Sequence, residues 1–190
     1  MRAATATEQS AKAGDAGTTR PASVESLVSE VRERAREEWP PRIYRDRVLA
    51  MRTRSHTVPA TPKGGKGARS AGVEILHTLL GIELKVGRRR ISCPDLATAR
   101  YLSVFARAGV AEVAVPYDIT KISRLADELE SAWQRMLLLA DDVSRDRADS
   151  FRSRVRSAVV KEARREIEEA GAGTAIPQFN QNTRQRPQRI

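Results

Sequence analysis

Apolar residues recur at helical intervals near the start of the chain. Leu27, Val31, Ala35 and Trp39 stand four residues apart, which places them on one face of a helix. Ser23 precedes this run, and serine is a favoured residue type for a helix N-cap. The pattern therefore predicts an amphipathic helix that begins at Ser23.

Two prolines follow this helix at positions 40 and 41. Proline lacks the backbone donor that a helix interior needs and restricts the residue before it, so we expect the helix to stop or kink there. Ile43 and Val48 continue the apolar pattern beyond the prolines. They predict a second short helix, which completes an N-terminal helical segment over residues 22–51.

The pattern changes from helical spacing to alternation after position 71. The stretch AGVEILHTLLG fits either a helix or a strand, whereas IELKV alternates apolar and polar residues and is followed by Gly87. A two-residue turn at Gly87-Arg88 would give a hairpin with one apolar face and one polar face. The predicted register pairs Val86 with Arg89, Leu84 with Ile91 and Ile82 with Cys93.

A helix and a further strand are predicted after the hairpin. The stretch PDLATARYLSVFARAGV has an apolar side at helical spacing, and Pro94 or Asp95 would stand at the start of the helix. The stretch VAEVAVP then alternates up to Pro116, as a short strand does. Two strands joined by a helix in about 20 residues form the minimal crossover unit, so the sequence predicts a β-β-α-β centre.

Two long amphipathic helices are predicted in the C-terminal half. The first runs from Ile119 to about Val143 with Asp118 as its cap, and the second runs from about Ser144 to Ala170. At about 100° per residue the two apolar stripes are turned by roughly 70° from each other, so we expect a break near ADDVSRD. The first stripe consists of Ile122, Leu125, Leu129, Ala132, Trp133, Met136 and Ala140, and the second of Ala148, Phe151, Val155, Ala158 and Val159.

These elements predict an α+β protein with a small β-β-α-β core, long C-terminal amphipathic helices and disordered N- and C-terminal tails. Residues 1–21 and 171–190 lack periodic apolar positions and are expected to be disordered. Residues 52–70 are rich in proline, glycine and basic side chains. That composition predicts a linker between the 22–51 segment and a folded core over residues 71–170.

The chain is strongly basic, with 34 Lys and Arg residues against 24 Asp and Glu residues and a formal charge of +10. Such a protein is attracted to polyanions such as DNA, RNA, ribosomes or an anionic membrane surface. Aromatic residues make up only 4% of the chain, which argues against a surface that stacks nucleic-acid bases. We therefore expect contacts to phosphates rather than to bases.

The sequence contains no sign of a membrane span, a secretory signal or a metal site. No apolar run approaches the roughly 18 residues of a membrane helix, and the first residues lack the apolar core of a secretory signal. The single cysteine excludes an internal disulfide, and no Cys or His cluster has the spacing of a zinc site. We expect a cytoplasmic protein that uses no metal or other cofactor.

Positive charge gathers in three parts of the chain. Between Arg42 and Arg69 the only acidic residue is Asp46, three arginines stand at the predicted hairpin tip, and basic residues flank the apolar stripe of the last helix. An alternative interpretation of the tip arginines is that they are solvated and keep an edge strand from pairing with another chain. The predicted nucleic-acid-binding residues are Arg42, Arg45, Arg47, Arg52, Arg54, Lys63, Lys66, Arg69, Arg88, Arg89, Arg90, Arg147, Arg154, Lys161 and Arg165.

Two functions from different classes are consistent with these features. No combination of nucleophile, base and orienting group is visible, which favours a protein that is not an enzyme. The first hypothesis is a nucleic-acid-associated accessory or regulatory protein that binds DNA or RNA, ribosomes included. The alternative is a protein–protein interaction adaptor whose long helices form a homodimer or dock on a helical partner, with Phe151, Val155 and Val159 as the interaction face.

The Cys93-Pro94 pair supports a third hypothesis. The order strand, Cys-Pro, helix, strand, helix resembles that of the small sulfur-carrier proteins, whose functional cysteine lies in a Cys-Pro motif at a helix start. The resemblance implies a reactive thiol at Cys93, although Leu96 stands where that family usually carries a second proline. The predicted hairpin register instead buries Cys93 beneath Ile82, where a free cysteine behaves as a small hydrophobe.

Overall fold

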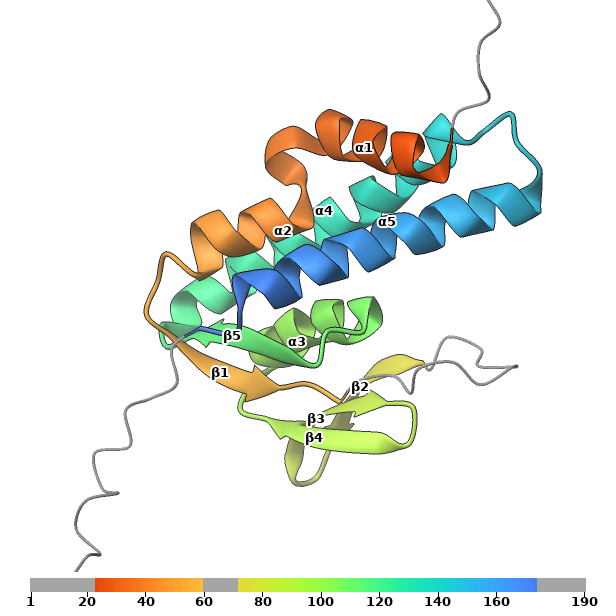
Figure 1. The fold of residues 1–190 in the computed structure, drawn as a ribbon. Helices are drawn as coiled ribbons and strands as arrows, with labels where there is room; N and C mark the ends of the chain where they lie inside the picture. The colour runs from red at the N-terminus through yellow and green to blue at the C-terminus, as the bar shows by residue number, and fades with distance from the viewer. Residues whose placement is uncertain (1–22, 60–71, 174–190) are drawn as a thin grey trace, which may run out of the picture.

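The structure, a computed structural model, describes residues 23–59 and 72–173 and confirms the α+β class (Figure 1). Two small antiparallel sheets, β1-β5 and β2-β3-β4, pack with helices around one apolar core. The strands are β1 (Thr53–Thr57), β2 (Val73–Thr78), β3 (Gly81–Val86), β4 (Arg89–Cys93) and β5 (Glu112–Pro116). The helices are α1 (Val24–Ala35), α2 (Pro40–Ile43), α3 (Leu96–Ala108), α4 (Ile119–Val143) and α5 (Asp149–Ala170).

The N-terminal helices form as the sequence predicts. The Ser23 hydroxyl accepts a hydrogen bond from the Ser26 N–H at 3.2 Å, so Ser23 caps α1. A 3-10 turn follows α1, and α2 then begins at Pro40, the first helical position, where proline loses no hydrogen bond. A turn of π-helix, Tyr44–Val48, continues α2. The four apolar positions predicted to line α1 and its extension are all buried.

The expectation that the folded core begins near Ala71 is wrong. The buried residues of α1 and α2 belong to the same apolar cluster as those of α4 and α5. Figure 1 shows α1 and α2 lying across the two long C-terminal helices. The four helices bury one another because each is amphipathic, and an amphipathic helix needs an apolar partner surface. The segment before the expected linker is therefore part of the main fold.

Strand β1 lies inside the range predicted as a linker. It pairs antiparallel with β5 in a register that matches Thr53 with Pro116 and Thr57 with Glu112. The predicted crossover unit is consequently wrong, because β5 pairs with β1 and does not join the sheet of β3 and β4. The sequence TRSHT contains no apolar residue, so its pairing depends on the buried partner β5 and leaves no periodic signal.

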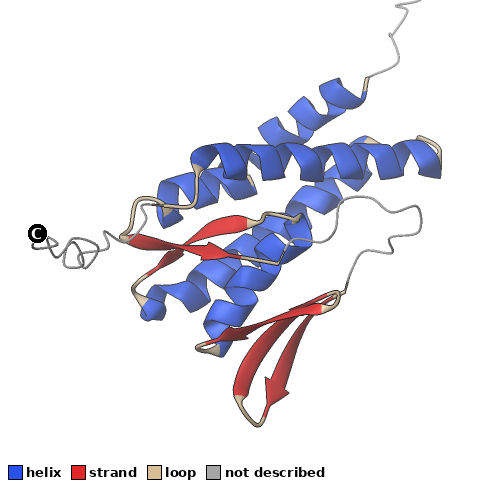
Figure 2. Ribbon diagram, turned by 60° about the horizontal axis from the view of Figure 1, so that its bottom comes forward, coloured by secondary structure: helices blue, strands red, loops and turns tan. Residues whose placement is uncertain are grey.

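The hairpin of β3 and β4 has the predicted register, residue for residue. Gly87 has a φ of 61° in the turn, a conformation that glycine adopts without strain. The ambiguous segment ahead of it is strand β2, which pairs antiparallel with β3. Its turn into β3 leaves Leu79 and Leu80 almost entirely exposed. Figures 1 and 2 show that this sheet lies against α3 on the side away from the long helices.

Helix α3 has clear signals at both ends. The Asp95 side chain accepts a hydrogen bond from the Thr98 N–H at 2.7 Å, which caps the helix as predicted. Gly109 ends it with a φ of 77°, a left-handed conformation that favours glycine at this position. One side of α3 faces α4 and the other faces the three-stranded sheet, so nine of its 13 residues are buried. This helix joins the two parts of the fold.

The two long helices are separated by the predicted break. Helix α4 ends at Val143 and α5 begins at Asp149, later than the expected Ser144. All seven apolar positions predicted for α4 are buried. Of the stripe predicted for α5, Val155 and Val159 are buried, and burial then continues at Ala163 and Ile167 toward the end of the helix. The fully buried apolar residues of α5 are Val155, Val159, Ala163 and Ile167.

Two buried tyrosines bind the middle of β5. The Tyr44 hydroxyl accepts a hydrogen bond from the Ala114 N–H at 2.8 Å and donates one to the Gly171 carbonyl at 2.7 Å. The Tyr101 hydroxyl donates to the Ala114 carbonyl at 2.7 Å. Burial raises the pKa of Tyr44 to about 12 and that of Tyr101 well above its usual range. These bonds connect the π-helical turn after α2, helix α3, strand β5 and the residue that follows α5.

Candidate nucleic-acid interface

Most of the net charge lies outside the described residues. Residues 23–59 and 72–173 hold 25 Lys and Arg side chains against 22 Asp and Glu side chains, a net +3 of the total +10. The remaining +7 belongs to segments 1–22, 60–71 and 174–190. Many arginines of the folded part also lie within ion-pair distance of a carboxylate. The basic residues without an acidic partner are therefore the ones available to bind a polyanion.

The turn between β3 and β4 carries three exposed arginines. Among the described residues, Arg88 and Arg89 have no ion-pair partner, while an Arg90 nitrogen lies 3.5 Å from a Glu83 oxygen across the hairpin. The first residue of this turn, Gly87, donates its N–H to the Gly72 carbonyl at 3.1 Å. Gly72, which follows the acid-free segment 60–71 in the sequence, thus lies beside the arginine turn.

A second group of unpaired cations lies on the outer face of α5 and the turn before it. Arg154 and Lys161 are seven residues apart on α5, which places them on one helix face, and Arg147 lies in the turn just before the helix. Within the described part of the chain none of the three has an ion-pair partner. The guanidinium carbons of Arg147 and Arg154 lie 5.7 and 5.2 Å from the ring centre of Phe151. Exposed serines at positions 150, 153 and 157 stand between these cations.

Four other predicted contact residues form ion pairs or an aromatic contact within the folded part. Arg42 lies within ion-pair distance of Glu37 and Asp46, and Arg47 pairs with Glu128. Arg52 and Arg165 also contact neighbouring side chains.

Arg52 lies over the ring of Tyr117, with 5.1 Å between its guanidinium carbon and the ring centre. Arg165 pairs with Glu162 and Glu169, and these partners raise its pKa further. Arg54 is half-buried on β1. Arg45 has no ion-pair partner within the described ranges. Lys63, Lys66 and Arg69 lie outside the described residues.

The predicted interaction face on α5 is not a surface of the folded chain. Val155 and Val159 are fully buried between α5 and the other helices. Phe151 is half-buried, with arginines on two sides. The apolar stripe packs within the chain because α1 and α4 supply its partner surface. A partner would therefore have to bind elsewhere.

Cys93 is a core residue. It is only 5% exposed, its pairing with Ile82 is as predicted, and burial raises the pKa of its thiol. A raised pKa disfavours the thiolate, which is the nucleophilic form of cysteine. This environment contradicts the reactive cysteine that the resemblance to sulfur carriers implied. Among residues 23–59 and 72–173, no group of His, Cys, Asp and Glu side chains could hold a metal ion.

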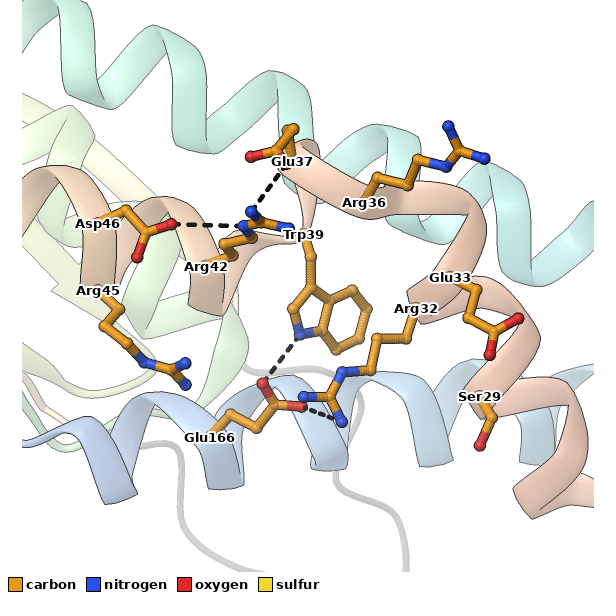
Figure 3. Close-up of a pocket in the computed structure, with 10 residues that line it drawn as sticks. All are labelled: Ser29, Arg32, Glu33, Arg36, Glu37, Trp39, Arg42, Arg45, Asp46 and Glu166. Carbon is orange, nitrogen blue, oxygen red and sulfur yellow. Dashed lines mark hydrogen bonds and ion pairs between the residues drawn. The ribbon is translucent and has the colours of Figure 1, made fainter.

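A groove at Trp39 is the feature that the sequence did not reveal. The Trp39 indole N–H donates to a Glu166 oxygen at 3.1 Å, and an Arg32 nitrogen lies 3.3 Å from the other carboxylate oxygen (Figure 3). Arg36 stands at the rim with a φ of 47°, the only non-glycine residue of the described ranges with positive φ. Glu166 and Trp39 are 127 residues apart in the chain, so no local pattern could pair them.

The described residues form an α+β fold with a net charge of only +3, many ion pairs and two clusters of cations that have no ion-pair partner within those residues. No family model, no curated protein and no solved structure matches the chain. In the part of the chain that the structure describes, every helix is too short or too polar to cross a membrane.

Proposed function

We propose that this protein binds nucleic acid through phosphate contacts at the end of the molecule that carries the β3–β4 turn. One observation supports this most strongly. Among the described residues, whose charges otherwise nearly balance, two groups of exposed cations have no acidic partner. One is Arg88 with Arg89, and the other is Arg147 before α5 with Arg154 and Lys161 on it. Figures 1 and 2 both show the β3–β4 turn and the turn between α4 and α5 toward the same end of the molecule.

The chemistry of these groups suits a phosphate backbone. Arginine presents a planar fork of donors that matches phosphate oxygens, and serine hydroxyls donate to the same atoms. The 60–71 segment adds three cations and no acid directly before Gly72. Neither group contains an exposed aromatic platform for base stacking. Binding is therefore expected to depend steeply on salt and weakly on base sequence.

The test is fluorescence anisotropy of the full chain with labelled duplex DNA, duplex RNA and a single strand, from low to physiological salt. The wild-type protein should bind at least one of them, with log affinity falling linearly against log salt. Arg88→Glu with Arg89→Glu should weaken binding by about tenfold or more at low salt. It should also make the dependence of log affinity on log salt less steep, by the amount expected for the loss of about two phosphate contacts.

Arg124→Glu, compared with Arg89→Glu alone, is the matched control for the change in charge. Arg124 is exposed on α4, has no ion-pair partner among the described residues and belongs to neither cluster. Its reversal should change affinity far less than that of Arg89. Equal effects of the two reversals would show that only net charge matters and would reject the site. Dissociation constants weaker than about 10⁻⁴ M for all three nucleic acids at low salt would reject the function.

A further inference from the structure

The outer edges of the two sheets differ in how they are protected from pairing with another chain. On β5, tyrosine hydroxyls bind the backbone N–H and C=O of Ala114. Strand β1 is wholly polar and carries Arg54, and β4 carries Arg89 and Arg90. Covering groups and charged side chains are the usual means by which a sheet edge is kept from pairing. The fourth edge is β2.

Strand β2 lacks these protections. Its sequence VEILHT contains no lysine, arginine or proline, and it pairs with β3 in an unbroken register without a bulge. Its one carboxylate, Glu74, already accepts a hydrogen bond from Lys85 of β3 at 2.9 Å. Ile75 and Leu76 lie on opposite faces of the sheet, and both are half-buried. A regular edge with apolar residues on both faces is the kind that pairs with another strand.

The pairing with β3 shows which backbone groups of β2 face outward. Gly87 donates its N–H to the Gly72 carbonyl at 3.1 Å, so these two residues form a bonded pair. Bonded and non-bonded pairs alternate along antiparallel strands. The even-numbered residues of β2 therefore face β3, and the backbone groups of Val73, Ile75 and His77 face outward. Within residues 23–59 and 72–173 these outward groups have no hydrogen-bond partner.

The outward edge of β2 is complementary to a second copy of itself. In an antiparallel pair centred on Ile75, this residue faces Ile75 of the second copy, and Val73 faces His77. The outward N–H and C=O groups of the two copies would then form about six hydrogen bonds. Glu74 would face Leu76, so no like charges would be opposed, and the two Leu76 side chains would be diagonal neighbours on the outer face.

We propose that this protein forms a symmetric dimer in which the β2 strands of two copies pair antiparallel. The two three-stranded sheets then continue into one another across a two-fold axis at Ile75, and both copies use the same surface. A single pair of strands is a small interface, so we expect a reversible dimer in the micromolar range. The proposal is independent of nucleic-acid binding, because it uses neither the arginine turn nor α5.

The test begins with the oligomeric state of the full chain, purified free of nucleic acid. Sedimentation equilibrium at protein concentrations up to about 1 mM should show a monomer–dimer equilibrium. Hydrogen exchange followed by NMR then locates the interface. The outward amides of β2, at Val73, Ile75 and His77, should exchange more slowly as the dimer fills. The outward amides of β4, at Arg90 and Ser92, should keep the same rates at every concentration.

A pair of proline variants separates the two edges of the sheet. His77→Pro removes an outward N–H at an exposed position, and the hydrogen bonds between β2 and β3 stay intact. By symmetry it deletes two hydrogen bonds of the dimer, so the dissociation constant should rise by about tenfold or more. Ser92→Pro is the matched control, because it makes the same change at an exposed, outward position of β4. It should leave the dissociation constant unchanged.

The exposed turn between β2 and β3 supplies a second control. Leu79→Ser with Leu80→Ser removes apolar surface beyond the paired strand and should leave the dimer intact. Loss of the dimer in this variant would mean that the turn, and not the strand edge, holds the copies together.

Three further results would overturn the proposal. The first is a monomer at every concentration. The second is that the exchange rates of the outward β2 amides do not depend on concentration. This second measurement uses the wild-type protein, so it stays decisive if His77→Pro fails to fold. The third is that His77→Pro and Ser92→Pro weaken the dimer equally.

Discussion

The two sheets of this protein are both antiparallel, yet they are held in different ways. In the β1-β5 sheet, every residue of β5 except Glu112 is buried, and two tyrosine hydroxyls bind the backbone of Ala114. In the β2-β3-β4 sheet, only three residues are fully buried, and a single helix, α3, covers one face. These buried residues are Leu84, Val86 and Cys93.

This difference in burial predicts that the two sheets open at different free energies. Strands with many buried apolar contacts open only with the whole molecule, whereas strands with few such contacts open locally. We therefore expect the β1-β5 sheet to belong to the global folding unit and the three-stranded sheet to open at lower free energy. The three-stranded sheet also presents the exposed Leu79–Leu80 turn at one end and the arginine turn at the other. Both exposed turns therefore belong to the sheet that is expected to open more easily.

The largest effect should come from Phe105→Ala. Phe105 is 1% exposed and lies between the two tyrosines, with ring centres 5.5 Å from Tyr44 and 5.0 Å from Tyr101. Removing this ring leaves a cavity, so we expect the free energy of unfolding to fall by about 3–5 kcal/mol in denaturant titrations. Leu79→Ala, at a wholly exposed turn position, is the control and should stay within about 0.5 kcal/mol. Similar losses for both variants would refute the contrast.

High pH should lower the stability of the fold through Tyr44, one of the two tyrosines that contact Phe105. The pKa of Tyr44 is raised from 10.0 to about 12, so the folded state favours the protonated phenol. Its contribution to stability is complete below pH 10 and is lost as the pH rises through about 12. Ionisation also removes the O–H that donates to the Gly171 carbonyl. Denaturant titrations at increasing pH should therefore show falling stability across this range.

Tyr44→Phe is the variant that isolates this contribution. It should be less stable than the wild-type protein at neutral pH, because the Ala114 N–H and the Gly171 carbonyl lose their partner. Its stability should then fall less steeply between pH 10 and 12. A pH dependence identical to that of the wild-type protein would show that Tyr44 does not carry the effect.

Features set by neighbouring residues could be predicted from the sequence. The register of β3 with β4 follows from alternation around Gly87, and the start of α3 follows from Asp95. The stripe of α4 follows from helical spacing alone. In each case the residues that determine the structure lie within a few positions of one another, so a periodic pattern records them.

Features set by distant residues could not be predicted. Strand β1 is polar and becomes a strand only against β5, which follows more than 50 residues later. The Glu166 carboxylate contacts Trp39 and Arg32, which lie more than 120 residues earlier in the chain. The two candidate surfaces differ in the same respect. The arginine turn was visible as a run of like residues, whereas the groove depends on how three helices pack.

The smallest effect expected is the one most specific to the three-stranded sheet. Ile91 on β4 is half-buried and packs on the core from the inner face of the sheet. Ile91→Ala should lower the free energy of unfolding by about 1–2 kcal/mol, less than a fully buried site would, because part of the side chain is already in water. If the sheet opens locally, hydrogen exchange should quicken for the amides of β3 and β4 while those of β5 keep their wild-type rates. Equal acceleration in β5 would mean that the two sheets unfold together, and that the exposed turns belong to one cooperative unit with the tyrosine-bound core.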